Sequence, residues 1–294
     1  MVSAGVVGFA RRDGKATAVR MRGEAGAQIM IWTGAALVGL VALFAVLAPW
    51  VSPWGPVEID AEAIRSAPSG DHPLGTDVNG MDVLSRLAYA ARVDLLVAIV
   101  AVALAVAGGA ILGVTTGYAG GWFDAVVMRL LEIVQSFPTF ILALAVAALL
   151  GPGVVNLTIV VAIVSVPSYA RLIRAEVRTV RELAYVDAAR TSGISTLAVL
   201  VRHVLPNSLT AVRIVAPLNV GWAMLALAGL SFLGLGVPIP EPEWGAMISQ
   251  GTSDLVSGRL WTTVPPGLFL VICVLGFSLL GEGLQERENR RRTR

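Results

Sequence analysis

The residues between 182 and 207 have types and a spacing that suit the docking of another protein rather than covalent chemistry. Asp187 is followed by two alanines, and three further residues separate these from Gly193. Small side chains let another backbone approach closely, and glycine permits a turn that a residue with a Cβ resists. The stretch is too polar to span a bilayer, although apolar runs flank it on both sides. We therefore expect an exposed short helix over 182–192 that contacts a partner, with an ordinary inter-helix loop as the alternative.

Patterns for catalysis and nucleotide binding are missing from the sequence. Lys15 is the single lysine, and Phe9 stands where the first glycine of a phosphate-binding loop would have to be. The two histidines and Cys273 lie far apart, so they predict neither a metal site nor a disulfide. We expect a chain that is not an enzyme, binds no cofactor, and draws energy from a partner or an ion gradient.

Long apolar runs make up most of the chain. Hydrophobic residues are 56% of the 294 and charged residues only 14%, against roughly a quarter in an ordinary globular domain. Because apolar runs of about 18 or more residues are candidate transmembrane helices, we predict an all-α membrane protein. Pro138, Pro167 and Pro217 fall inside spans and should kink them, while Pro206 fits the first turn of the fifth span. The six predicted spans are 29–49, 95–117, 125–150, 154–171, 209–233 and 264–284.

Basic residues gather in three segments. Residues 1–28, 171–207 and 285–294 together hold sixteen of the 22 Lys and Arg residues, whereas the loops on the opposite side of six spans hold four. Because cytoplasmic loops carry an excess of Lys and Arg, we expect all three segments, and so both termini, in the cytoplasm. The domain layout is then a cytoplasmic segment 1–28, a transmembrane domain 29–284 and a basic tail 285–294. The first apolar run is too long for a signal peptide, and we interpret it as an uncleaved span.

Two substantial loops, 51–94 and 234–263, fall on the outer side. They hold ten acidic residues against four basic ones, which favours a partner with basic patches. From Trp244 onward the apolar residues have helical spacing, which predicts a short amphipathic helix on the outer membrane face. Trp244 and Trp261 could then sit at the level of the lipid headgroups.

Several charged or small residues have both a structural and a functional interpretation. Four arginines between 171 and 181 share one helical face, which suits lipid headgroups or a partner protein. Glycines 109, 113, 117 and 121 recur at every fourth position, which favours close helix packing over the lining of a pathway. Arg129 and Glu132 are three residues apart, so a local ion pair explains them better than a gate.

The outer loop and the stretch 182–207 carry a family resemblance. The outer loop contains His72, Pro73, Leu74, Gly75, Thr76 and Asp77, then Asp82-Val83-Leu84-Ser85-Arg86; a second motif is GLSFLGLG at 229–236, followed by Trp244-Gly245. With the spacing of the stretch 182–207, these resemble permease subunits of ATP-binding-cassette (ABC) importers, in the dipeptide, oligopeptide and nickel branch, C-type. The resemblance runs from about residue 29 to 283. It departs from the pattern at Asp187, which replaces the glutamate of the "EAA" motif, and at His203, where isoleucine is frequent.

The resemblance implies a role for each motif. The segment 175–207 would be the cytoplasmic coupling loop that docks on a separate ATPase; its coupling residues would be Glu182, Tyr185, Asp187, Ala188, Ala189, Gly193, His203, Leu205 and Pro206. Asp77 and Asp82 are expected to organise the outer loop, and the lone His72 does not make a metal site.

The resemblance also implies an assembly in the bacterial cytoplasmic membrane. The partners would be a second homologous permease, two ATPase subunits that bind ATP and Mg²⁺, an extracytoplasmic substrate-binding protein and the lipid bilayer, with no nucleic acid. The expected cargo is a di- or oligopeptide, with nickel or another small solute as the alternative.

An ion-coupled carrier or channel working alone is the rival from another class. Such a protein would need carboxylates in mid-bilayer, which the second, fourth, fifth and sixth spans lack. A membrane enzyme is disfavoured because the sequence shows no cluster of a nucleophile, a base or metal ligands. The sequence does not determine how each helix is rotated about its axis, so it names no pathway residue.

Overall fold

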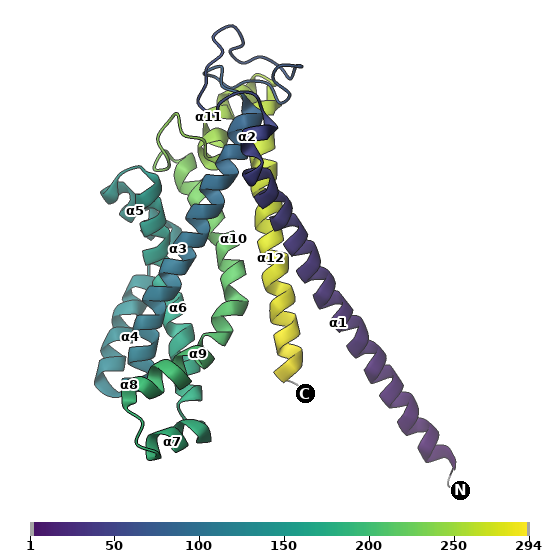
Figure 1. Cartoon of the computed structure of the whole chain (residues 1–294), viewed down its shortest axis with the longest axis vertical. Helices are drawn as coiled ribbons and strands as arrows, with labels where there is room; N and C mark the ends of the chain where they lie inside the picture. The colour runs from purple at the N-terminus through teal and green to yellow at the C-terminus, as the bar shows by residue number, and fades with distance from the viewer. Residues whose placement is uncertain (1–2, 293–294) are drawn as a thin grey trace.

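The computed structural model describes residues 3–292, with side chains from 25 to 290, as a bundle of long helices along one main axis (Figure 1). Its long helices are α1 (Ser3–Val46), α3 (Val83–Ala119), α6 (Val154–Val180), α10 (Thr210–Phe232) and α12 (Val264–Arg292). Within the described range there is no strand, only two isolated β-bridges in the outer loop. The all-α prediction is therefore confirmed.

The third predicted span is broken rather than merely kinked. Helices α4 (Gly121–Gln135) and α5 (Thr139–Leu150) meet at 88°, and each of the five long helices contains a stretch apolar enough to cross a bilayer. Among the described residues this gives six spans if the bent pair counts as one. The break falls at Pro138, because proline donates no hydrogen bond and disfavours a helical conformation in the residue before it.

Helix α3 begins earlier than predicted and shortens the first outer loop. Asp82 caps its N-terminus, since Oδ2 accepts a hydrogen bond from the Ser85 backbone N–H at 2.7 Å. The sequence predicted loop up to residue 94, but residues 83–94 are helical. A short helix α2 (Ala48–Val51) precedes the remaining loop.

Three glycines let α3 and α6 pack at close range. A Cβ at Gly109 would lie 2.4 Å from the Tyr169 Cβ, and one at Gly113 would lie 2.6 Å from the Ala170 carbonyl oxygen. Gly117 similarly faces Val177. This confirms the packing interpretation for these three. The fourth glycine, Gly121, faces open space and lies at the start of α4 with φ +61°.

We expect Gly113→Ala to destabilise the protein while Gly39→Ala does not. The added methyl at residue 113 meets the backbone of α6, so the two helices must separate, at about 1–3 kcal/mol for overpacking. At Gly39 nothing lies within 4 Å, so the same change meets no neighbour. Thermal unfolding midpoints of the two variants in detergent check this, and equal midpoints would contradict the packing account.

The two outer loops form a single platform at one end of the bundle (Figure 1). It contains α11 (Trp244–Val256) and the short helical turn η2 (Leu260–Thr262). Arg65 Nε lies 2.9 Å from Asp254 Oδ1, and Arg86 Nη1 donates to the Pro240 carbonyl at 2.9 Å. The first contact joins loop 52–82 to the segment 233–263, and the second joins the start of α3 to the same segment.

Burial of key side chains corrects two expectations for this platform. The helix predicted from Trp244 onward exists, but Trp244 is fully buried and donates its indole N–H to the Leu87 carbonyl at 3.1 Å. It is therefore not a headgroup anchor. Half of the ten outer acids are also buried, so the surface excess of acid is smaller than the sequence suggested; the buried ones are Asp77, Asp82, Asp94, Glu243 and Asp254.

Glu243 shows why these acids are buried. Its carboxylate caps α11 by accepting hydrogen bonds from the Gly245 and Ala246 backbone N–H groups at 2.8 and 2.7 Å. Burial raises the pKa of Glu243, and the two backbone donors oppose that rise. The carboxylate therefore serves the internal structure of the platform.

Candidate functional site

The segment predicted to dock a partner lies at the end of the bundle opposite the outer platform (Figure 1). Helix α7 (Ala184–Thr191) confirms the short helix expected over 182–192. Gly193 ends it with φ +80°, a left-handed conformation that suits glycine. The chain then continues through α8 (Thr196–Val199), the π-helical turn η1 (Leu200–Val204) and α9 (Leu205–Ser208).

The adjacent alanines 188 and 189 of α7 differ in burial. Ala189 is buried together with Val186, and both belong to the apolar core that includes Val199 and Val204. Ala188 is exposed on the surface of the helix. We predicted from the sequence that both alanines would contact a partner. In the structure, only Ala188 is exposed enough to contact another protein.

Polar and apolar side chains both lie on the exposed surface around Ala188. Asp187 is exposed and pairs with Arg190, Oδ1 to Nη1 at 3.2 Å, and the Tyr185 ring lies 6.4 Å from that of His203. Leu197 is 71% exposed on the neighbouring α8. Glu182, just before α7, is exposed as well. A partner could therefore meet an apolar surface bordered by charges.

Pro206 occupies a different place from the one predicted. It lies inside a run of short helical segments from 196 to 208, rather than at the first turn of a new span, and α10 begins only at Thr210. Proline has no N–H for the carbonyl four residues earlier. The adjacent turn is π-helical, with the Leu205 N–H donating to the Leu200 carbonyl, which accommodates that missing bond.

Three of the four arginines in the predicted stripe bind groups of this chain. Arg174 Nη2 donates to Asp124 Oδ2 at 2.6 Å, and Arg178 bonds the same carboxylate. Arg181 donates to the Gly117 and Tyr118 carbonyls at the end of α3, at 2.9 and 3.1 Å. Of the four, only Arg171 remains exposed.

Asp124 therefore joins the first turn of α4 to the C-terminal part of α6. It is 3% exposed, and no sequence pattern pointed to it. Further along α4, Arg129 and Glu132 form the expected local ion pair at 3.2 Å, with both side chains well exposed.

The outer-loop signature residues hold one another in place. His72 is buried, with Nδ1 3.0 Å from Asp82 Oδ1 and Nε2 3.4 Å from Asp60 Oδ2, and its ring stacks on Trp54. Asp77 Oδ1 accepts the backbone N–H groups of two residues in the following turn. Among the described residues no group of three His, Cys, Asp or Glu side chains could hold a metal ion. Asp77 and Asp82 thus organise the loop.

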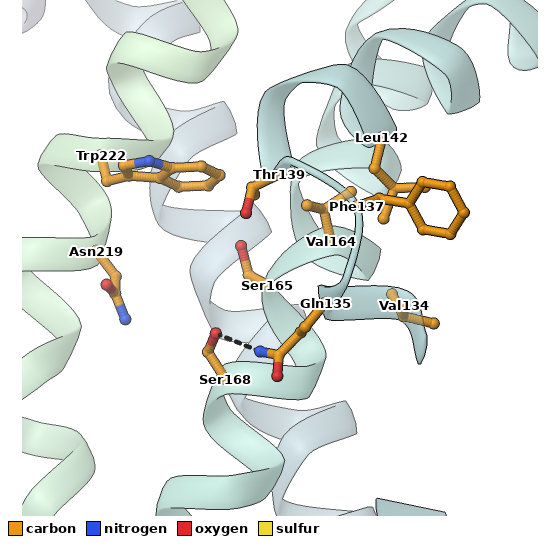
Figure 2. A pocket seen from close by; sticks show the side chains of 10 residues that line it. All are labelled: Val134, Gln135, Phe137, Thr139, Leu142, Val164, Ser165, Ser168, Asn219 and Trp222. Atoms are coloured by element: carbon orange, nitrogen blue, oxygen red, sulfur yellow. Dashed lines mark hydrogen bonds between the residues drawn. The ribbon is translucent and has the colours of Figure 1, made fainter. Parts of the chain in front are cut away.

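A cavity of about 250 Å³ lies at the break between α4 and α5 (Figure 2). Figure 1 shows that this break is about midway along the bundle. Helices α6 and α10 form its other walls. Its lining residues are Val134, Gln135, Phe137, Thr139, Leu142, Val164, Ser165, Ser168, Asn219 and Trp222.

All three prolines predicted to kink spans lie at the level of this cavity. Pro138 separates Phe137 from Thr139, Pro167 precedes Ser168, and Pro217 is two residues before Asn219. The break at Pro138 turns α5 away from α4 and leaves room between the helices. Uncharged polar residues beside in-span prolines were the signal that could have indicated the cavity.

Amide and hydroxyl groups dominate the polar part of the cavity. Figure 2 shows Gln135, Ser165, Ser168 and Asn219 turned toward the space between α6 and α10, with the Trp222 ring above them. Gln135 Nε2 donates to Ser168 Oγ at 3.1 Å, while Gln135 Oε1 is buried without a hydrogen-bond partner among the described residues. Such a wall can exchange hydrogen bonds with a polar, uncharged ligand.

Comparison with known proteins places these features in context. Residues 109–294 match the family described as the inner membrane component of binding-protein-dependent transport systems. The chain is 38% identical over 256 residues to the dipeptide transport system permease protein of Alkalihalophilus pseudofirmus, covering 85% of this chain and 84% of that protein. It is 36% identical over 260 residues to the glutathione transport system permease protein of Escherichia coli O6:K15:H31, covering 88% and 86%. The corresponding protein of Pectobacterium atrosepticum is 37% identical over 227 residues, covering 77% and 75%. The family match includes both the segment 182–207 and the cavity residues.

Proposed function

Since this chain belongs to the family of inner-membrane permease components of bacterial binding-protein-dependent ABC transport systems, we propose that it forms one half of a pathway for short peptides, driven by a separate ATPase. The two kinds of relative named above are permeases for dipeptides and for glutathione, and glutathione is itself a short peptide. The second half of the pathway is a homologous permease.

The observation that carries this proposal is the exposed helix α7. It projects from the bundle with buried apolar residues behind it and a mixed apolar and charged surface in front. Such a surface suits a protein partner. We assign the coupling residues to this surface, with Ala189 supporting it from behind, and we assign ATP and Mg²⁺ to the partner ATPase.

The route from α7 to the cavity is continuous. α7 follows α6 after a turn, and α6 carries Ser165 and Ser168 on the cavity wall. Asp124 ties the same end of α6 to α4, which forms the opposite wall. Movement of α7 on the ATPase would therefore shift both walls together, as a two-state membrane element biased by partner contacts.

The proposed orientation puts α7 and both termini in the cytoplasm. Its support is the concentration of basic residues in 1–28, 171–207 and 285–294. The outer platform then faces the substrate-binding protein.

The alternatives fit the cavity less well than a peptide does. Nickel would want imidazole, thiolate or carboxylate ligands, and the described lining offers amides and hydroxyls instead. An ion-coupled carrier would need a carboxylate in the cavity. Asp94, the buried acid of α3, instead accepts the Trp244 backbone N–H at 3.1 Å near the platform.

Binding of the partner ATPase to membrane vesicles tests the proposal. We expect purified ATPase to bind inside-out vesicles that contain this chain and its partner permease, and not right-side-out vesicles. With the substrate-binding protein added on the outer side, the assembled complex should take up a labelled dipeptide only when ATP is supplied. ATPase binding to right-side-out vesicles would contradict the orientation, and peptide uptake without ATPase would contradict the mechanism.

A further inference from the structure

We propose that the cavity at the α4–α5 break recognises the uncharged backbone amides of the transported peptide, so that the permease itself selects for peptide bonds. This inference rests on the proposed function and adds a ligand chemistry to a specific site. Both sides of the cavity contribute, with Gln135 from α4 and Asn219 from α10.

The hydrogen-bonding groups of the wall match those of a peptide bond. A primary amide side chain offers both an N–H donor and a carbonyl acceptor, which are the complements of a backbone C=O and N–H. Gln135 Oε1 is a buried acceptor that lacks a partner within the described part of the chain, so a ligand N–H is what it needs. Ser168 Oγ lies next to the amide nitrogen of Gln135 in Figure 2, and Ser165 stands further along the same helix.

The absence of charge in the described lining sets the selectivity. None of the ten lining residues is acidic or basic. A charged peptide terminus would therefore gain no ion pair at this wall, whereas an uncharged amide exchanges its hydrogen bonds with water for bonds to the wall. The wall should discriminate by the presence of amide groups and not by the charge of the peptide's side chains.

Trp222 gives the cavity an apolar surface next to its amides. Its ring lies across from Thr139 in Figure 2, and the side chain is 37% exposed halfway along α10. Tryptophan in membrane proteins concentrates near the interfaces instead. An indole face at this depth offers contact area to the side chain of a peptide whose backbone bonds to Asn219.

The size of the cavity suits one half of a pathway that is shared with a second permease. Its volume of about 250 Å³ lies below the roughly 300–1,000 Å³ of closed small-molecule sites. It is also bordered by Phe137, which is 54% exposed. A second permease facing this opening would complete the site around a short peptide.

The test compares a peptide bond with an ester in the complete transporter. The probes are trialanine and its analogue in which an ester oxygen replaces the first amide N–H, and the readout is the ratio of their ATP-driven uptake. The binding protein and ATPase are the same in every arm, so a change in this ratio comes from the permease. We expect Gln135→Leu and Asn219→Leu to lower the preference for the amide by about fivefold, as for one lost hydrogen bond.

The controls separate this inference from the proposed function. Gln285→Leu makes the same change at an exposed position of α12 and should keep the wild-type ratio. Ser168→Ala removes one hydroxyl with minimal structural change and should lower the ratio even if a leucine variant fails to assemble. An unchanged ratio in Ser168→Ala and in the assembled leucine variants would overturn the amide site while leaving peptide transport standing. Absence of ATP-driven trialanine uptake by the assembled wild-type transporter would overturn both.

Discussion

Replacing Ala188 with tryptophan is expected to reduce ATP-driven uptake at least about tenfold while leaving the amount of protein in the membrane unchanged. Ala188 is exposed on α7, so the new side chain disturbs mainly what docks there. An indole at the centre of an interface holds the two proteins apart, and a loss of about 1.4 kcal/mol in binding already gives a factor of ten. The effect is measured as peptide uptake, and as ATP hydrolysis stimulated by the substrate-binding protein, in reconstituted vesicles.

Two matched substitutions sharpen this prediction. Ala189→Trp places the same side chain into the core behind α7, so it should lower the amount of folded protein as well as uptake. Ala25→Trp changes an exposed alanine of α1 and should have no effect on either. Wild-type uptake with wild-type ATPase stimulation in Ala188→Trp would show that α7 does not carry the coupling.

Removing the carboxylate of Asp124 is expected to destabilise the protein by roughly 2 kcal/mol and to abolish most transport. Asp124→Ala leaves Arg174 and Arg178 facing each other without their shared anion. A fully buried pair would cost about 3–5 kcal/mol and an exposed one about 0–1; these arginine side chains are partly exposed, which gives an intermediate value. The transport rate should fall by more than the loss of folded protein explains, because α4 is no longer tied to the end of α6 that leads into α7.

The ion pair of Arg129 and Glu132 on the same helix supplies the control. Their side chains are 78% and 53% exposed, so Glu132→Ala should change the unfolding midpoint little. Thermal unfolding in detergent and uptake in vesicles are measured for both variants and for Asp124→Asn, which keeps the volume but removes the charge. If Asp124→Ala and Glu132→Ala behave alike, the cluster has no special part in stability or coupling.

Local chemistry explains why much of this architecture was predictable. Apolar run length indicates a span, because a lipid-buried backbone must satisfy its own hydrogen bonds in a helix of sufficient length. The positive φ of Gly193 and the packing of Gly113 depend on the absence of a Cβ, which is visible in the residue type. The helix from Trp244 onward was indicated by its spacing alone.

Two of the corrected predictions concern contacts across long stretches of sequence. Trp244 binds the carbonyl of Leu87, 157 residues away, and Asp124 meets Arg174 across 50 residues. The local sequence around a tryptophan does not determine whether its side chain is exposed or buried. The expected position of Trp244 among the lipid headgroups could therefore be checked only in the packed structure. The split of the alanine pair depends equally on which face of α7 meets Val199 and Val204.

Residue types and their spacing were thus sufficient for the class of protein, for most of the spans and for the exposed short helix α7, because hydropathy, helical period and backbone freedom act over a few residues. The cavity, the shared carboxylate of Asp124 and the buried platform acids required the packed structure. They depend on the rotation of each helix about its axis, which is set by neighbours that are distant in the chain, and on the 88° angle between α4 and α5, which the presence of Pro138 alone does not fix.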